Sequence, residues 1–277
     1  MDGIIMIYSF GDSFTAGLGV DREYETSQLG GHPDWDVMTD DEKNAQRSKV
    51  ERFRNKNSYT AHFASKVNIG YSNKGQSGCS NIDILNLIFE YDDYFKQGDI
   101  VFVGFTSSLR NPISFFPRKF SETEWKLAPN LDVLKDFTTL KVNENMLELY
   151  TEESMSFFQD YSKFYLTEMF DEQYYEIVNY NIIVFLQKYF EYKKVNYIMF
   201  DAFDYMVNKN YKHINQKYYW NFNNETIYSY IASFNDEGLL EKAGYSSYNQ
   251  APRHPSIEGH KILAEELYKF YKKVYNG

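Results

Sequence analysis

The sequence predicts an α/β fold in which a mostly parallel sheet is covered by helices on both faces. Short apolar runs, typical of buried strands, alternate along the chain with longer stretches of helical periodicity. The clearest run, DIVFVGF at residues 99–105, has no polar alternation, which is typical of a strand covered on both sides. We therefore expect a layered α/β/α arrangement.

Each element follows from a local pattern. The predicted strands are apolar and rich in β-branched or aromatic residues, and they span residues 4–10, 67–71, 99–105 and 196–200. Ser80 and Asp83 have the spacing of a capping box and predict a helix that begins behind Ser80. Further helices are predicted by apolar periodicity over residues 58–66, 152–194 (as two helices) and 257–274.

The chain of 277 residues shows no repeat and no clean linker, so we expect a single domain over residues 1–277. Three stretches break the alternation and are interpreted as long excursions, at about residues 21–57, 111–145 and 202–250. Residues 21–57 are charged and irregular, too polar for a core and too long for a simple turn.

Composition excludes several functional classes. The net charge of −10 argues against a sequence-independent nucleic-acid binder and against an anionic membrane surface. A single cysteine, Cys79, allows neither an intramolecular disulfide nor a thiolate metal cluster. The first residues lack a basic leader, and no segment approaches the length of a membrane span. We expect a soluble cytoplasmic protein without a signal peptide.

The working site of a parallel sheet lies beyond the carboxyl ends of its strands, and several candidate residues fall there. Ser13 follows the first strand, and a serine needs a base and oxyanion donors to act as a nucleophile. His254 precedes the last helix, and Gly78 lies in a loop where backbone N–H can approach a ligand. Hydroxyl donors follow residues 99–105, namely Thr106, Ser107 and Ser108.

These segments resemble the SGNH/GDSL hydrolase superfamily, which comprises serine esterases and lipases with a flavodoxin-like three-layer fold. The resemblance lies in GDSFTAG (residues 11–17), NKGQSGCSN (73–81) and HPSIEGHKILA (254–264), in the order of that family. It implies that Ser13 is the nucleophile, that the N–H of Gly78 donates to the oxyanion, and that His254 is the general base. Asp12 is more simply interpreted as structural support of the turn.

Two family positions differ. The third family block has an oxyanion-binding Asn, whereas this chain has GFTSSLRN, so one of the three hydroxyl residues would replace that Asn. Arg110 is close enough in sequence to bind an anionic group or a sugar hydroxyl instead. The family also has an Asp three residues before the histidine, where this chain has Ala251. The alternatives for orienting the imidazole are a backbone carbonyl or a side chain, with Asn249, Asp201 and Asp204 as candidates.

Other patterns have a structural interpretation. The remaining histidines (His32, His62, His213 and His260) have no acidic partners at ligand spacing, so we predict packing roles, no metal site and no cofactor. The aromatic stretch 205–231 contains Tyr218, Tyr219, Trp220 and Phe222. Core packing is the favoured interpretation of these rings, with sugar stacking as the competing hypothesis. On that hypothesis, this stretch and residues 21–57 wall the cleft.

The function predicted from sequence is hydrolysis of a carboxylic ester through an acyl-serine intermediate. The polar, aromatic excursions favour a small O-acyl group, such as acetate, on a carbohydrate, and no nucleic-acid or membrane partner is expected. One alternative is a binding or structural protein in which the site has degenerated. Another is transfer of the acyl group to a sugar acceptor by the same serine and histidine.

Overall fold

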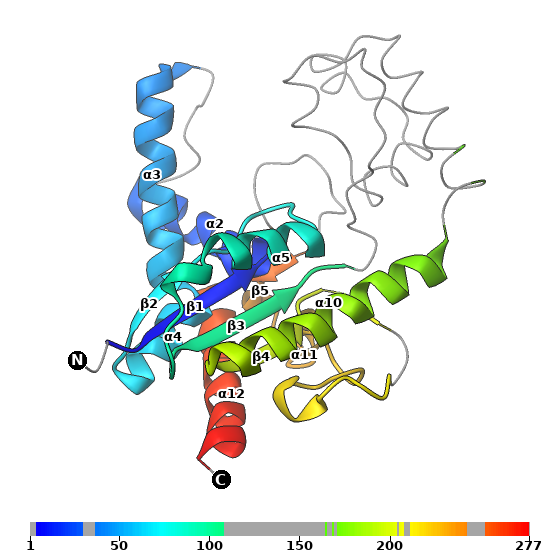
Figure 1. The fold of residues 1–277 in the computed structure, drawn as a ribbon. Helices are drawn as coiled ribbons and strands as arrows, with labels where there is room; N and C mark the ends of the chain where they lie inside the picture. Colours follow the sequence, from blue (N-terminus) through cyan, green and yellow to red (C-terminus); the bar gives the residue numbers. More distant parts are fainter. Residues whose placement is uncertain are drawn as a thin grey trace.

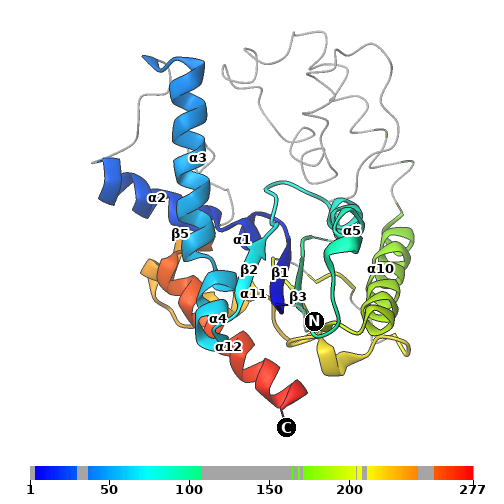
Figure 2. The ribbon, with the colours of Figure 1, turned by 60° about the vertical axis from the view of Figure 1, so that its left-hand side comes forward.

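The structure is a computed structural model that describes residues 4–29, 37–107, 164, 168, 171–203, 205–207, 211–242 and 253–276. Its centre is a four-stranded sheet in the order β2-β1-β3-β4, in which every pairing is parallel (Figure 1). The strands are β1 (Met6–Gly11), β2 (Gly70–Asn73), β3 (Ile100–Phe105) and β4 (Asn196–Asp201). Helices cover both faces of this sheet, so the predicted fold class is confirmed (Figure 2).

One face of the sheet packs against α5 (Asn81–Glu90) and α10 (Glu172–Lys193), and we call it the α5/α10 face. Val101 and Val103 of β3 point to this side and contact a core that includes Ile88, Leu186 and Phe190. The predicted capping box is present, with Ser80 and Asp83 satisfying each other's backbone N–H groups at the start of α5.

The other face packs against α4 (Tyr59–Val67), α11 (Ile227–Ala232) and α12 (Ile257–Tyr275), and we call it the α4/α12 face. Phe102, which alternates with the two valines along β3, contacts Phe63 of α4 there in an edge-on arrangement at 4.8 Å between ring centroids. Because β3 is buried along its whole length, its sequence is continuously apolar.

The boundaries of most predicted elements agree with the structure to within two residues, but the second strand was placed too early. Val67 is the last residue of α4, and Asn68 ends the helix in the left-handed conformation with φ 54°. The strand therefore begins only at Gly70, because the helical turn has to close first.

Part of the segment 21–57 is regular, contrary to the expectation of an irregular insertion. It contains α2 (Asp21–Tyr24), the π-helical turn η2 (Glu25–Leu29) and α3 (Asp40–Asn57), preceded by the 3-10 turn η1 (Leu18–Val20). The helix α3 extends away from the sheet, so few of its side chains are buried and its sequence is polar (Figure 1). The predicted excursion at 111–145 lies outside the described residues.

The aromatic stretch after β4 is core. Trp220, Tyr219 and Phe222 are 1%, 2% and 6% exposed, so these rings are not available for stacking on a sugar and the hypothesis is wrong for them. Tyr218 is half-buried and stacks on Tyr275 of α12. The short elements of the region are η6 (Gln216–Tyr218), η7 (Glu237–Leu239), β5 (Leu240–Lys242) and β6 (Arg253–Pro255), while η4 (Asp92–Tyr94) follows α5.

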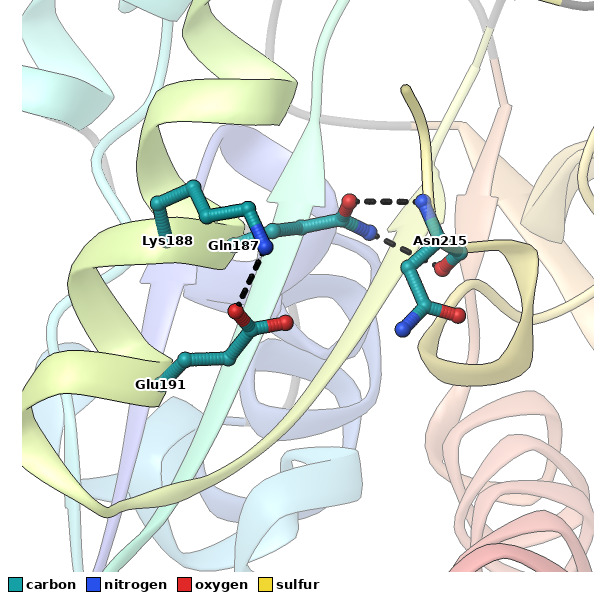
Figure 3. Close-up of polar contacts among 4 residues, drawn as sticks. All are labelled: Gln187, Lys188, Glu191 and Asn215. Carbon is teal, nitrogen blue, oxygen red and sulfur yellow. Dashed lines mark hydrogen bonds and ion pairs between the residues drawn. The ribbon is translucent and has the colours of Figure 1, made fainter. Parts of the chain in front are cut away.

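A buried amide fastens this region to α10. The side chain of Gln187 donates to the carbonyl of Asn215 at 3.0 Å and accepts from its N–H at 2.8 Å (Figure 3). The nearby pair of Lys188 and Glu191, at 2.7 Å, lies on the surface of the same helix (Figure 3). None of the helices in the described part of the chain is both long and apolar enough to cross a membrane.

Candidate active site

The turn after β1 presents Ser13 at the carboxyl edge of the sheet. Asp12 caps the short helix α1 (Ser13–Ala16), and its carboxylate accepts a hydrogen bond from the N–H of Phe14 at 3.0 Å. The other carboxylate oxygen accepts from the hydroxyl of Thr106 at 2.8 Å. Asp12 is fully buried and joins the ends of β1 and β3.

Ser13 and His254 are brought together across 241 positions of sequence. The Nε2 atom of His254 lies 2.7 Å from the Oγ atom of Ser13, which is hydrogen-bond distance. Both residues are 5% exposed, so the contact is largely shielded from solvent. This is the geometry that proton transfer from a serine hydroxyl to an imidazole requires.

A short antiparallel ribbon carries the histidine to this position. His254 lies on β6 and pairs with Glu241 of β5. Gly19 allows the ribbon to approach, because a Cβ atom at that position would lie 2.1 Å from the carbonyl oxygen of Pro255 and 2.7 Å from that of His254. Sequence analysis missed Gly19, although the paired glycines of Gly17-Leu-Gly19 directly after the nucleophile motif were a usable signal.

An aromatic ring from α1, the helix that begins at Ser13, contacts the imidazole of His254. The ring of Phe14 lies 4.7 Å from the ring of His254, tilted by 36°. Phe14 in turn contacts the rings of Phe203 and Tyr228. Because Phe14 is adjacent to Ser13 in the chain, one short helix positions both Ser13 and a ring that contacts the imidazole of His254.

Gly78 provides an open backbone N–H beside the same edge. Its φ of +76° lies in the left-handed region that favours glycine, and a Cβ atom there would meet nothing within 4 Å. Within the described residues, no hydrogen bond uses the N–H of Gly78 or that of Ser13. Both N–H groups are therefore free of protein partners in the described part of the chain.

The loop that carries Gly78 is tied to α1 through Asn73, a residue to which the sequence assigned no role of its own. The side-chain amide of Asn73 donates to the carbonyl of Thr15 at 2.7 Å, and its oxygen accepts from the N–H of Gly75 at 3.0 Å. Gly75 lies so close to α1 that a Cβ atom would be 2.3 Å from the backbone nitrogen of Ala16. The N–H of Gln76 also donates to the carbonyl of Gly11 at 2.8 Å.

Thr106, one of the three hydroxyl residues predicted to bind the oxyanion, uses its hydroxyl within the protein instead. Thr106 donates its only hydroxyl hydrogen to Asp12, so in this arrangement it supports the turn and does not point a donor at an oxyanion. Asn81 holds the same strand end, accepting from the N–H of Thr106 at 2.9 Å and donating to the carbonyls of Thr106 and Ser107. Ser107 is buried, and Ser108 and Arg110 lie outside the described residues.

A buried polar layer lies beneath the turn, on the α4/α12 face. The hydroxyl of Tyr59 donates to Thr15 at 3.3 Å, and that of Thr60 donates to Ser9 at 2.7 Å. Burial raises the pKa of Tyr59 to about 12, so its phenol stays protonated and remains a donor. Sequence analysis missed this layer, since hydroxyls in the predicted helix 58–66 carry no signal of what they face.

His260 completes that layer and is not a second base. It is fully buried in α12, its Nδ1 atom accepts from the N–H of Tyr59 at 3.3 Å, and the two rings stack. Burial lowers the pKa of His260 to about 3, with the nearby His62 and His254 as smaller causes. Its imidazole is therefore neutral, which agrees with the packing role predicted for it.

The candidates for orienting His254 are only partly described. Asp201 accepts from the hydroxyl of Tyr219 at 2.7 Å and from the N–H of Met206 at 3.2 Å. Both of these partners belong to the core of the α5/α10 face, whereas Phe14, which supports the imidazole of His254, belongs to the other core. Asp204, Asn249 and Ala251 lie outside the described residues. Among the described residues, no group of three or more potential metal ligands is clustered.

Comparisons with known proteins find distant structural likeness. No family model and no curated protein matches the chain. One similar structure is a putative lipolytic protein of the G-D-S-L family from Desulfitobacterium hafniense DCB-2, with 14% identity over 96% of this chain and 98% of that one, at a TM-score of 0.31. Another belongs to work on a carbohydrate esterase whose active site displays divergent catalytic and non-catalytic binding functions. It has 14% identity over 99% of this chain and 66% of that one, at a TM-score of 0.37. At these TM-scores neither likeness bears on the reaction or substrate of this chain.

Proposed function

We propose that the protein hydrolyses a carboxylic ester through a covalent acyl-serine intermediate, with Ser13 as nucleophile and His254 as general base. The single observation that carries the proposal is the 2.7 Å contact between Oγ of Ser13 and Nε2 of His254. The free N–H groups of Ser13 and Gly78 support it, because acyl transfer needs donors where negative charge develops.

In the proposed reaction, Oγ of Ser13 attacks the ester carbon while His254 takes the hydroxyl proton. The carbonyl oxygen becomes an oxyanion held by the N–H groups of Ser13 and Gly78. Collapse of this intermediate breaks the bond to the alcohol oxygen, which leaves with the proton from His254. Water then attacks the acyl-serine with His254 again as base, and an acid is released with the serine regenerated.

Among esters, we propose a small O-acyl group, such as acetate, on a carbohydrate. Contact between Ser13 and His254 is shielded, with both residues 5% exposed, which suits a small acyl group. Asn73 and Gly75 fasten the oxyanion loop to α1, so the geometry is preorganised and does not have to be assembled around a large substrate.

The test is turnover of p-nitrophenyl acetate by wild type, Ser13→Ala and His254→Ala. Removal of either member of such a pair lowers kcat by roughly 10³-fold or more. His213→Ala removes an exposed histidine and serves as the matched control, with turnover expected to be unchanged. Equal activity in wild type and Ser13→Ala would contradict the proposal, and an inactive wild type that still binds sugars would favour a binding protein.

A further inference from the structure

A pocket of about 360 Å³ opens next to the oxyanion loop, on the outer side of α5. Ser77 and Gly78 contribute one wall, and the segment that holds them runs over the carboxyl edge of the sheet between β2 and α5 (Figure 2). Gly78 belongs both to this pocket and to the proposed oxyanion site, so the two adjoin each other at this residue. The volume lies near the lower end for small-molecule sites, which suits one sugar ring.

The helix α5 supplies the opposite wall with a single polar stripe. Asp83, Asn86 and Glu90 all line the pocket, and their spacing of three and four residues places them on one side of the helix. Gln76 adds a second amide from the loop. The side chains of Gln76, Asn86 and Glu90 make no hydrogen bond within the described residues, so their donors and acceptors are available to a ligand.

The chemistry of this lining favours a polyhydroxylated ligand. Amide, hydroxyl and carboxylate groups alternate around the pocket, and Leu87 is its one large aliphatic side chain among the described residues. An acyl chain would leave these polar groups without partners, whereas sugar hydroxyls both donate and accept hydrogen bonds. The pocket therefore suits the alcohol side of an ester better than its acyl side.

The charge of the lining adds a selection. Two lining residues, Asp83 and Glu90, are acidic, and none of the described residues that line the pocket is basic. One oxygen of Asp83 accepts from the N–H and the hydroxyl of Ser80, so this carboxylate is fixed in place beside the pocket. A ligand that carries its own carboxylate would be repelled.

We propose that this pocket binds the alcohol part of the substrate and selects an uncharged sugar over an acidic one. The inference rests on the proposed ester hydrolysis at Ser13. Asn86 and Gln76 bind ring hydroxyls, and Glu90 excludes carboxylated sugars such as uronic acids.

A matched pair of substrates tests the selection. Methyl 2-O-acetyl-xyloside and methyl 2-O-acetyl-glucuronoside differ only in the carboxylate at C5, and each keeps two free ring hydroxyls. We expect wild type to have the higher kcat/KM on the xyloside. Glu90→Gln should raise kcat/KM for the glucuronoside by about two- to fivefold, a modest gain because exposed charges are screened by solvent. It should change kcat/KM for the xyloside by less than about twofold. This increase in kcat/KM for the glucuronoside should be smaller at high salt, because salt screens the repulsion between the carboxylates. Asn86→Ala raises KM for both glycosides roughly two- to tenfold, because one hydrogen bond to a ring hydroxyl is lost.

The control is Asp93→Asn, which removes one exposed carboxylate that does not line the pocket. If Asp93→Asn shifts the preference as much as Glu90→Gln, the selection arises from overall charge and the proposal is wrong. The proposal is also wrong if Glu90→Gln changes kcat/KM by the same factor for both glycosides.

A binding measurement separates this inference from the proposed function. Calorimetric Kd values for the two glycosides, measured in Ser13→Ala with and without Glu90→Gln, need no turnover. A lower Kd for the xyloside than for the glucuronoside, with the two Kd values made equal by Glu90→Gln, would support the proposed pocket. This holds even if wild type does not hydrolyse p-nitrophenyl acetate. Equal binding of both glycosides would overturn the pocket even in an active esterase.

Discussion

The two faces of the sheet use buried polar groups in different ways. On the α5/α10 face, the buried amide of Gln187 fastens a loop through the backbone of Asn215. On the α4/α12 face, Tyr59 and its neighbours fasten α1, the helix that carries Ser13. The faces share the same strands, with side chains alternating between them.

Substitutions on the two faces should therefore affect different quantities, folding stability on one face and turnover on the other. A substitution in the α5/α10 core should change how firmly the protein folds without moving Ser13. A substitution in the polar layer should cost less folding free energy and disturb α1, where small misplacements reduce rates strongly. This contrast can be tested from each side.

The largest effect is expected from Leu186→Ala, which empties a fully buried site in α10. We expect a loss of about 2–5 kcal/mol in the free energy of unfolding, from lost burial and the remaining cavity. Urea denaturation measures it, and Tyr192→Ala, at an 82% exposed position of the same helix, is the control. A tenfold loss of turnover in folded Leu186→Ala would break the comparison.

The next effect is a pH dependence from His260. Its pKa is about 3 in the folded protein against 6.5 for an ordinary histidine, so the unfolded chain binds the extra proton first as the pH falls. The contribution of neutral His260 to the free energy of unfolding is therefore complete above pH 6.5 and is lost as the pH falls below it. The expected loss between pH 7 and pH 5 is about 2 kcal/mol.

Denaturation at the two pH values, in wild type and in His260→Asn, isolates this contribution. The asparagine keeps an acceptor for the N–H of Tyr59 but does not titrate. If both proteins lose the same stability on acidification, His260 is not held neutral by burial.

A smaller change in stability, with a clear change in turnover, is expected from Tyr59→Phe. Loss of the hydrogen bond to Thr15 costs about 1 kcal/mol, and turnover should fall several-fold because α1 loses a support. Tyr8→Phe, on the α5/α10 face, is the matched control and should leave turnover unchanged. A double-mutant cycle with Thr15→Val measures the coupling between Tyr59 and Thr15. Additive effects of the two substitutions would show that the hydrogen bond between them does not support α1.

The smallest effect is expected from Lys188→Ala on the outside of α10. Its ion pair with Glu191 joins side chains that are 71% and 39% exposed, so solvent screens it. A change of no more than a few tenths of a kcal/mol in urea denaturation is expected. A loss above about 1 kcal/mol in the free energy of unfolding would show that this exposed ion pair contributes more to stability than expected.

The sequence predicted the parts of the site that depend on local chemistry. The glycine, aspartate and serine after the first strand, and the capping box behind Ser80, are local patterns, and the structure contains both. His254 was predicted by resemblance, and the short contact with Ser13 agrees with that prediction without testing its role.

The unpredicted parts depend on contacts between distant segments. Thr106 follows the expected strand, yet its hydroxyl bonds to Asp12, which only the pairing of β1 with β3 brings near. Gly19 matters because β6 packs on it from more than two hundred residues away. Such contacts leave no periodic trace in the sequence, and the roles proposed for Ser108 and Arg110 stay predictions.

The most direct test of the central claim is labelling of the intact protein with a fluorophosphonate, with the modified residue mapped by mass spectrometry. We predict one adduct, on Ser13, that is absent in Ser13→Ala and forms more slowly in His254→Ala. An unlabelled wild type, or an adduct that persists in Ser13→Ala, would contradict the assignment of Ser13 as an activated nucleophile.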